Sequence, residues 1–382
     1  MVQGEHEVHP YEMQDPPINQ IPRTADLIAE QMQSGLHIGA QVYVSRGGET
    51  IADFALGESR PGVAMTPDTI MLWMSATKPT GAVAIAQLWE RGLLALDDPI
   101  ARHVPEFAQN GKDRITIRHI LTHTAGIRWI ETGWPNASFD EVVAKVCAMR
   151  AERDWIPGRK AGYSAYISWY VLAEIVRRLT GRDYAAYVRE EIFIPLGMTD
   201  CWIAMPPDVY RAYGTRLGIM QKTEGGKIAD LGLDTEAACT NPRPSGSGHG
   251  PMRELARFSQ MLLSHGELDG NRILRPQTVE ALVARHRAGM FDHTFKHVLD
   301  FGLGFVLNSN QYGIDAVPYG YGPHALPRTF GHSGMQSSCA FADPENELAV
   351  AIVFNGTPGE AAHDRRLRAV LAAMYEELGI VN

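Results

Sequence analysis

Two side chains near the start of a predicted helix have the types and spacing for nucleophilic catalysis. Ser75 and Lys78 are three residues apart, which on a helix places both on one face, roughly 5–6 Å apart at Cβ. A serine hydroxyl is a poor nucleophile until a neighbour takes its proton, and a lysine can do so when burial and nearby positive charge lower its pKa. The pair therefore predicts acyl transfer to Ser75. The alternative is a chance pairing on an exposed helix end.

The helix that must position this pair has start and stop signals of its own. Pro79 is tolerated only in a first turn, where its missing N–H has no helical partner, and Gly92 suits a left-handed C-cap. Residues 82–86 are small and apolar, which predicts a helix buried on most sides. A serine at this helix N-terminus would also gain from N–H groups that favour developing negative charge.

Two further segments could contribute chemistry. Tyr163 ends the segment 157–163, just before a helix predicted over 165–179, and a tyrosine there is by default a half-buried packing residue. The segment 330–335 (Phe-Gly-His-Ser-Gly-Met) leads into a strand at 337. Glycines at such a position predict a bend or a close backbone approach, for example to a ligand.

Taken together, these motifs resemble the serine β-lactamase-like superfamily, in particular its class C and penicillin-binding-protein-like branch and the family VIII carboxylesterases. The resemblance extends from about residue 25 to 378. It rests on Ser-Ala-Thr-Lys-Pro at 75–79, Gln-Leu-Trp-Glu-Arg-Gly-Leu-Leu-Ala-Leu-Asp-Asp-Pro at 87–99, Leu-Thr-His-Thr-Ala-Gly at 121–126, Pro-Gly at 157–158 and Tyr-Ser at 163–164. It implies the β-lactamase/transpeptidase-like α+β fold.

The resemblance also implies roles for individual residues. Ser75 would be the acylated nucleophile, Lys78 its neighbouring base, and Tyr163 a general base and then a general acid to the leaving group. The backbone N–H groups of Ser75 and Met335 would form the oxyanion hole. Substrate-binding residues would come from the third motif, namely His332, Ser333 and Gly334. No metal or cofactor is implied.

Two departures from the β-lactamase pattern favour ester substrates. The family pattern Tyr-x-Asn has Ala165 in place of the asparagine, so an amide that holds the β-lactam side chain is missing. The third motif typically begins with lysine and here begins with His332, so a fixed positive charge is lost at neutral pH. We therefore expect a serine carboxylesterase acting on a small-molecule ester or acyl substrate, with only slight activity on β-lactams.

Alternative functions remain open at this point. The same acyl-enzyme could serve an acyltransferase or amide-forming transacylase, a β-lactamase or a D-amino acid peptidase, and a binding or sensor module could retain the fold without turnover. His119 and His123 are four residues apart but lack the glutamate of a His-Glu-x-x-His metal site. No Gly-x-Ser-x-Gly motif occurs, which argues against an α/β-hydrolase.

Composition excludes several classes of partner. The chain of 382 residues has a formal net charge of −9 and no basic block, so nucleic acid is not an expected partner. No signal peptide and no apolar run of membrane-spanning length are evident, which predicts a cytoplasmic protein without membrane contact. The scattered residues Cys147, Cys201, Cys239 and Cys339 are expected to be free thiols. The oligomeric state is not predictable.

Strand patterns lie at both ends of the chain and helical patterns lie between them. This order predicts one largely antiparallel sheet assembled from residues 22–80 and 290–382, a mostly helical insertion over 81–289 and an extended tail over 1–21. Strands are predicted at 38–46, 49–57, 301–307, 337–342 and 347–354, and helices at 24–34, 75–92, 115–123, 139–150, 165–179, 183–193, 252–265, 276–287 and 363–378. Thr24 is the candidate N-cap of the first of these helices. Two long loops are predicted at 218–250 and 309–328.

Overall fold

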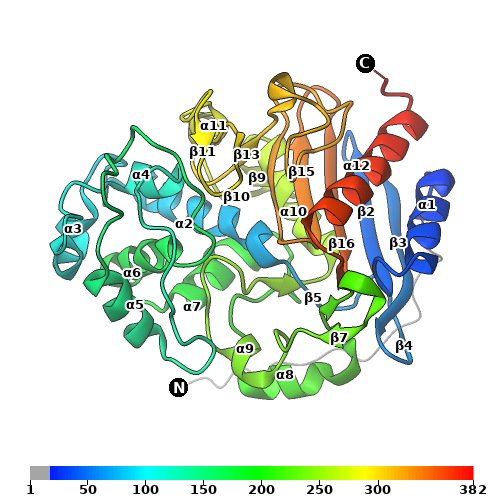
Figure 1. Cartoon of the computed structure of the whole chain (residues 1–382), viewed down its shortest axis with the longest axis horizontal. Coiled ribbons are helices and arrows are strands. Elements are labelled where there is room, and N and C mark those ends of the chain that lie inside the picture. Colours follow the sequence, from blue (N-terminus) through cyan, green and yellow to red (C-terminus); the bar gives the residue numbers. More distant parts are fainter. Residues whose placement is uncertain (1–17, 382) are drawn as a thin grey trace.

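The two ends of the chain form one antiparallel sheet, as the sequence predicts (Figure 1). The computed structural model describes residues 18–381. The strand order is β1-β3-β2-β16-β15-β14-β13, with β4 paired to β3. The strands are β1 (Ile18–Asn19), β2 (Gly39–Arg46), β3 (Glu49–Arg60), β4 (Val63–Ala64), β13 (Val306–Leu307), β14 (Phe330–Ser333), β15 (Ser338–Asp343) and β16 (Leu348–Phe354).

Two tight hairpins organise the sheet. Gly47 and Gly48 join β2 to β3 with φ angles of 57° and 86°, values that glycine adopts without steric cost. The turn after Asp343 joins β15 to β16, and β16 pairs with β2, so Ala351 lies opposite both Tyr43 and Ala340. The C-terminal hairpin therefore docks directly on the N-terminal one.

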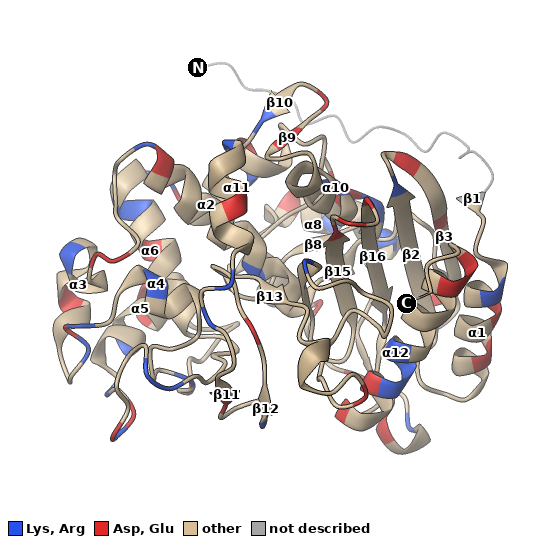
Figure 2. Cartoon of the chain, turned by 90° about the horizontal axis from the view of Figure 1, so that it is seen from above, with Lys and Arg blue, Asp and Glu red and all other residues tan. Residues whose placement is uncertain are grey.

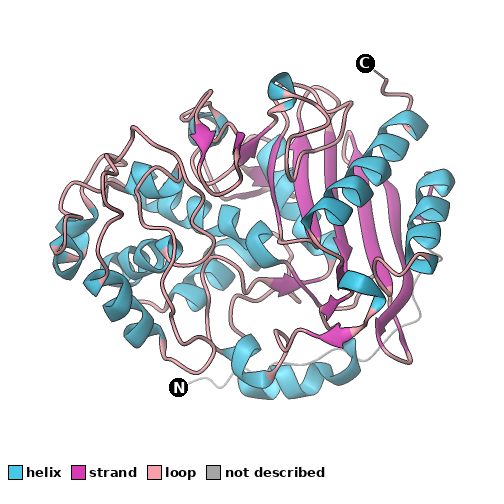
Figure 3. Ribbon diagram, in the orientation of Figure 1, coloured by secondary structure: helices cyan, strands magenta, loops and turns pink. Residues whose placement is uncertain are grey.

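Both faces of the sheet are covered by helices (Figures 1 and 3). α1 (Pro22–Gln33) and α12 (Glu360–Glu377) pack against each other on one face, and α10 (Met252–Leu263) packs on the other. Along β16, Ile352 and Phe354 belong to the core under α12, whereas Ala351 and Val353 belong to the core under α10. A strand covered on both faces is apolar at every position, which explains its continuous hydrophobic run.

α2 (Lys78–Glu90) runs through the centre of the helical part of the molecule. It contacts α6 (Ser168–Thr180), α7 (Tyr184–Val188) and α11 (Pro276–Val283), and residues 82–86 are fully buried, as their small side chains predict. The remaining helices are α3 (Ile100–His103), α4 (Ile117–Leu121), α5 (Phe139–Ala148), α8 (Pro207–Tyr213) and α9 (Glu236–Thr240). The remaining strands are β5 (Met71–Leu72), β6 (Gln221–Lys222), β7 (Ala229–Asp230), β8 (His249–Gly250), β9 (Glu267–Leu268), β10 (Asn271–Arg272), β11 (Phe291–Asp292), β12 (His297–Val298) and β17 (Gly356–Thr357). The division of the chain into 22–80 with 290–382 and 81–289 stays a prediction, and α10, from the middle segment, packs on the sheet.

Several local predictions are wrong. Thr24 is not the N-cap of α1, because the helix begins at Pro22 after Ile21, and the Thr24 hydroxyl donates to Glu377 at 2.6 Å. The strand predicted over 301–307 is reduced to Val306–Leu307, since the chain folds back on itself and Phe301 pairs with Val306. The segment 218–250 carries the short elements β6, β7, α9 and β8. Most of the tail predicted over 1–21 lies outside the described residues.

Surface and cysteine properties agree with the composition. Acidic and basic residues are interspersed along the elements seen in Figure 2. Across residues 18–381, none of the helices is both long enough and apolar enough to cross a bilayer. Cys147, Cys201, Cys239 and Cys339 are all buried free thiols.

Candidate active site

Ser75 lies in a short 3-10 turn, Met74–Thr77, that leads into α2. Met74 has a φ of 52°, a conformation that a non-glycine residue rarely adopts and that recurs at functional sites. The turn is held from two sides: the Ser338 hydroxyl on β15 donates to the Trp73 carbonyl at 2.5 Å, and the Gly248 N–H donates to the Thr77 hydroxyl at 2.9 Å. The half-buried serine is therefore fixed between β15 of the sheet and the segment that leads into β8.

Lys78 is fully buried and bonded to neutral groups only. Its Nζ lies 3.0 Å from the Ser75 hydroxyl, 2.8 Å from the Ala165 carbonyl and 3.1 Å from the Ser245 carbonyl. Burial, with a contribution from the positive charge of Arg243, holds the pKa of Lys78 well below its usual range. In a neutral amine the two N–H groups can serve the two carbonyls, which leaves the lone pair to accept from the Ser75 hydroxyl.

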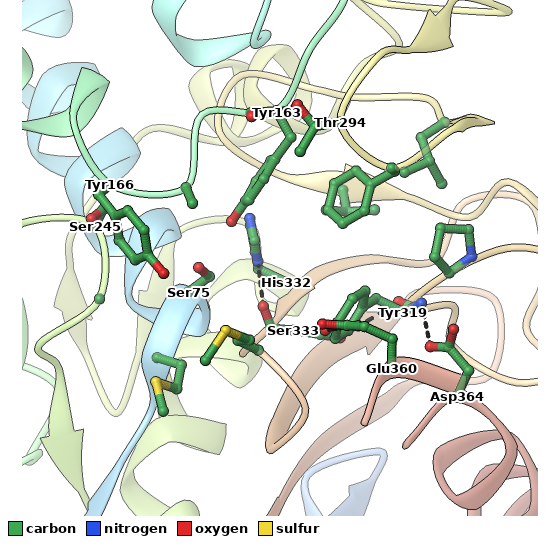
Figure 4. Close-up of a pocket in the computed structure, with 18 of the residues that line it drawn as sticks. Ser75, Tyr163, Tyr166, Ser245, Thr294, Tyr319, His332, Ser333, Glu360 and Asp364 are labelled. Carbon is green, nitrogen blue, oxygen red and sulfur yellow. Dashed lines mark hydrogen bonds between the residues drawn. The ribbon is translucent and has the colours of Figure 1, made fainter. Parts of the chain in front are cut away.

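Tyr163 reaches the same point from a loop about ninety residues later in the chain (Figure 4). It is buried, its hydroxyl is directed toward Ser75, and Lys78 Nζ lies 5.0 Å from its ring centroid. Burial raises the pKa of Tyr163, and the neighbouring Ser75 hydroxyl only partly opposes this rise. The phenol is thus protonated at neutral pH, which suits a proton donor better than a base.

A buried ion pair holds the backbone of Tyr163 in place. Asp292 accepts from the Tyr163 N–H at 3.1 Å, and Thr294 donates to the Tyr163 carbonyl at 2.9 Å. Asp292 is itself paired with Arg287 at 2.9 Å, and both side chains are almost completely buried. Nothing in the sequence around Asp292 or Arg287 marks this pair, because Tyr163, whose backbone it holds, lies 129 residues away from Asp292 in the chain.

The two histidines considered as metal ligands have structural contacts. His119 Nδ1 accepts from the Thr116 N–H and completes the capping box of α4. His123 Nδ1 accepts from the Ser164 N–H at 3.0 Å, and its ring lies 4.5 Å from that of Tyr163 and stacks on Trp169. Within the described part of the chain no three potential ligands come together as a metal site.

The third motif forms β14 at the edge of the cavity. His332 and Ser333 line the cavity, and His332 Nδ1 bonds to the Ser333 carbonyl at 2.9 Å. Burial and the neighbouring Lys78 lower the pKa of His332 to about 3, so the ring is neutral at pH 7. Gly334 does not line the cavity: a Cβ there would lie 2.5 Å from the Trp73 carbonyl, so this glycine permits close approach to the serine turn rather than to a ligand.

These groups open into one cavity of about 620 Å³. Its walls also include residues that are not among the predicted site residues. Tyr166 and Ser245 lie on one side of Ser75, and Tyr319, Glu360 and Asp364 lie on the other (Figure 4). Arg243 lines the same cavity. Long loops in compact domains are usually functional or mobile, and the segment 218–250 supplies Leu231, Leu233, Arg243, Ser245 and Gly246 to the cavity. The length of this loop was the available signal, but it does not single out any residue.

Comparison with known proteins agrees with this geometry. The family model described as Beta-lactamase matches residues 24–374. The chain belongs to this family. It is 28% identical over 347 residues to the esterase/beta-lactamase LipL of Mycobacterium tuberculosis. This alignment covers 83% of this chain and 77% of LipL.

Solved structures of the family share the fold. A penicillin-binding protein homologue from Caulobacter crescentus superposes with a TM-score of 0.78 at 30% identity, covering 96% of this chain and all of that one. A family VIII carboxylesterase superposes with a TM-score of 0.74 at 23% identity, covering 96% of this chain and all of that one. The chain is thus an enzyme of the β-lactamase-like superfamily with esterase relatives, and the predicted fold class is confirmed.

Proposed function

We propose that this β-lactamase family member is a serine carboxylesterase that works through an acyl-Ser75 intermediate. The observation that carries the proposal is the convergence of a nucleophile, a buried amine and a buried phenol at one point of an apolar-walled cavity. The relative LipL is named an esterase/beta-lactamase, which supports hydrolysis of carboxylic acid derivatives.

In the acylation step Ser75 Oγ attacks the ester carbonyl while its proton passes to the Lys78 amine. The resulting oxyanion is stabilised by the backbone N–H groups of Ser75 and Met335, a contribution on the order of 3 kcal/mol for each donor. In residues 18–381 no backbone or side-chain acceptor takes the Met335 N–H, which leaves it for a substrate. Collapse of the intermediate breaks the ester C–O bond, and Tyr163 donates its proton to the departing alkoxide.

The Lys78 ammonium, which lies beside the phenol ring, then returns its proton to the Tyr163 phenolate, so that both groups are restored before the second step. In the second step water attacks the acyl-serine, Lys78 again accepts a proton, and Ser75 Oγ leaves and is reprotonated. The low pKa of Lys78 and the raised pKa of Tyr163 support a mechanism in which Lys78 is the base and Tyr163 the acid. Of the double role predicted for Tyr163, this mechanism retains the acid half.

Esters fit the site better than β-lactams. Ala165 lines the cavity with a methyl group and contacts Lys78 only through its carbonyl, so it offers no side-chain amide to a substrate. The neutral His332 supplies no fixed positive charge from the third motif. The same acyl-enzyme would also transfer its acyl group to an alcohol or amine, and the apolar walls favour this second reaction by limiting access of water.

The proposal is tested by trapping the intermediate. Wild-type protein incubated with p-nitrophenyl butyrate and quenched in acid should show one butyryl adduct on the Ser75 peptide by mass spectrometry. Ser75→Ala should show no adduct and lose at least about 10³-fold in kcat, because no other group replaces the nucleophile. Ser264→Ala, outside the cavity, is the control. Full turnover by Ser75→Ala would refute the proposal.

A further inference from the structure

A buried arginine beside the serine lacks a counterion. Arg243 is 8% exposed and lines the same cavity as Ser75. Its guanidinium carbon lies 4.0 Å from the ring centroid of Trp134 and 5.5 Å from that of Tyr166. Among residues 18–381 no carboxylate forms an ion pair with it, and the groups that act on its charge are the phenols of Tyr166 and Tyr170. Arginine remains protonated at every physiological pH, so this charge is permanent.

The guanidinium also has unused hydrogen-bond donors. Its one side-chain bond within the described residues runs from Nη2 to the Gly246 carbonyl at 3.2 Å. Nε is buried and has no acceptor, and Nη1 contacts none of the described acceptors. Buried charges in proteins are normally paired or fully hydrogen bonded, because removing a charge from water is costly. Nε is enclosed by the protein, so Nη1 is the group that a ligand in the cavity can reach, and its unused donors indicate that an acceptor comes from a bound ligand.

Arg243 lies close to groups that take part in the proposed reaction. The carbonyl of Ser245, two residues along the chain, accepts a hydrogen bond from Lys78. The positive charge of Arg243 also acts on the Lys78 amine. Figure 4 shows Tyr166 and Ser245 on one side of Ser75 and Glu360 and Asp364 on the other. The two carboxylates would repel an anion at their end of the cavity. Within this cavity an anionic group is therefore best placed next to Arg243, whose charge also reaches the Lys78 amine.

We propose that Arg243 binds a carboxylate of the substrate, so that the enzyme prefers esters that carry a carboxylate close to the ester bond. The planar guanidinium offers parallel N–H groups that match the two oxygens of a carboxylate. This inference rests on the proposed esterase function and specifies its substrate class. The carboxylate is on either the acyl or the alcohol part, and the experiment has one arm for each.

A purely structural role for Arg243 predicts a different outcome. Stacking on Trp134 and bonding to Gly246 would stabilise the loop whatever the substrate. Loss of the positive charge would also raise the pKa of Lys78 and slow all substrates alike. The decisive quantity is therefore a ratio of kcat/KM values for an anionic ester and its neutral match, in which both of these effects cancel.

The test measures kcat/KM for p-nitrophenyl hemiglutarate against p-nitrophenyl valerate, and for 4-acetoxybenzoate against its methyl ester. We expect the anionic-to-neutral ratio of one pair to fall about tenfold to hundredfold in Arg243→Gln, and less in Arg243→Lys. The matched control is Arg189→Gln. Arg189 also stacks on a tryptophan, Trp202, and bonds to backbone carbonyls, but it lies outside the cavity. Its ratios should equal those of the wild type.

Unchanged ratios in both arms for a folded Arg243→Gln would overturn the inference while leaving esterase activity intact. If Arg243→Gln does not fold, benzoate and benzamide are compared as competitive inhibitors of wild-type valerate ester hydrolysis. Stronger inhibition by benzoate supports the inference, and equal inhibition overturns it. If the wild-type protein cleaves no ester at all, the proposed function fails, and calorimetric titration with benzoate and benzamide decides on Arg243 by the same criterion.

Discussion

Burial shifts the pKa values of the two groups beside Ser75 in opposite directions. It disfavours the charged form of each, so Lys78 loses its proton more easily and Tyr163 holds its proton more tightly. In the proposed mechanism the lysine is therefore the base and the tyrosine the acid, although in water their ordinary pKa values are nearly equal. Two residues with similar intrinsic chemistry thereby acquire complementary roles.

Replacing Lys78 should remove activity without removing the fold. We expect Lys78→Met to lower kcat for p-nitrophenyl butyrate about 10²- to 10⁴-fold, because the base is lost, with little loss in thermal stability, since the methionine is apolar in a buried place. Lys112→Met is the control, because Lys112 is also buried and bonds to backbone carbonyls, but far from the cavity. Equal activities of the two variants would contradict the role of Lys78.

The pH profile should report Lys78. Only its neutral amine activates Ser75, so kcat/KM for a neutral ester should rise with pH to a plateau, with a midpoint well below the ordinary lysine pKa. Arg243→Gln removes a positive charge that favours the neutral amine, so the midpoint should move to higher pH. The nearby His123 and His332 have lowered pKa values and stay neutral across this range. If the Arg243 substitution left the midpoint unchanged, the rise of kcat/KM with pH would report the titration of a group other than Lys78.

At the scale of elements, the site depends on contacts between segments that are distant in the chain. β15 holds the serine turn through Ser338, the segment before β8 holds it through Gly248, and β11 positions Tyr163 through Asp292. Each of these contacts ends on a backbone group, so the geometry is set by where the elements pack and not by the catalytic side chains themselves.

Breaking the ion pair beneath Tyr163 should destabilise the protein. Arg287→Met leaves the Asp292 carboxylate buried without its partner, and we expect a loss of about 3–5 kcal/mol in the free energy of unfolding. Urea denaturation followed by tryptophan fluorescence measures it. Arg211→Met breaks the exposed pair with Glu236 and should change stability by less than about 0.5 kcal/mol. Similar effects of the two substitutions would show that burial of the Arg287 pair has no energetic consequence.

At the scale of the whole molecule, the cavity lies where the sheet edge meets the helical part. One wall comes from β14 and α12 and another from the segment 231–246, so neither part alone encloses a substrate. The same packing buries all four cysteines and raises their pKa values.

The native protein should therefore react slowly with Ellman's reagent, because the reacting thiolate is scarce and inaccessible. After denaturation in guanidinium chloride the reagent should detect four thiols, and the melting temperature should not depend on dithiothreitol. Rapid reaction of a native thiol, or fewer than four thiols after denaturation without reductant, would contradict the described environments.

The sequence by itself determined the elements whose signals are local. Apolar periodicity, Gly47-Gly48 and the proline and glycine at the ends of α2 depend on neighbouring residues only, and the Ser75–Lys78 pair follows from helix geometry. Local signals failed where a distant partner decided, as for Thr24, which bonds to Glu377, and for the chain reversal that shortens the strand at 301–307.

Only the tertiary structure decided which chemistry each site residue can perform. The pKa of Lys78 depends on burial and on Arg243, the position of Tyr163 depends on Asp292, and Gly334 serves backbone approach instead of ligand contact. Arg243 itself could not be recognised in the sequence, because only the folded structure shows that no carboxylate of the described residues lies close enough to pair with it. The pKa value and the position of a side chain depend on the groups packed around it. For these residues those groups come from segments far away in the chain.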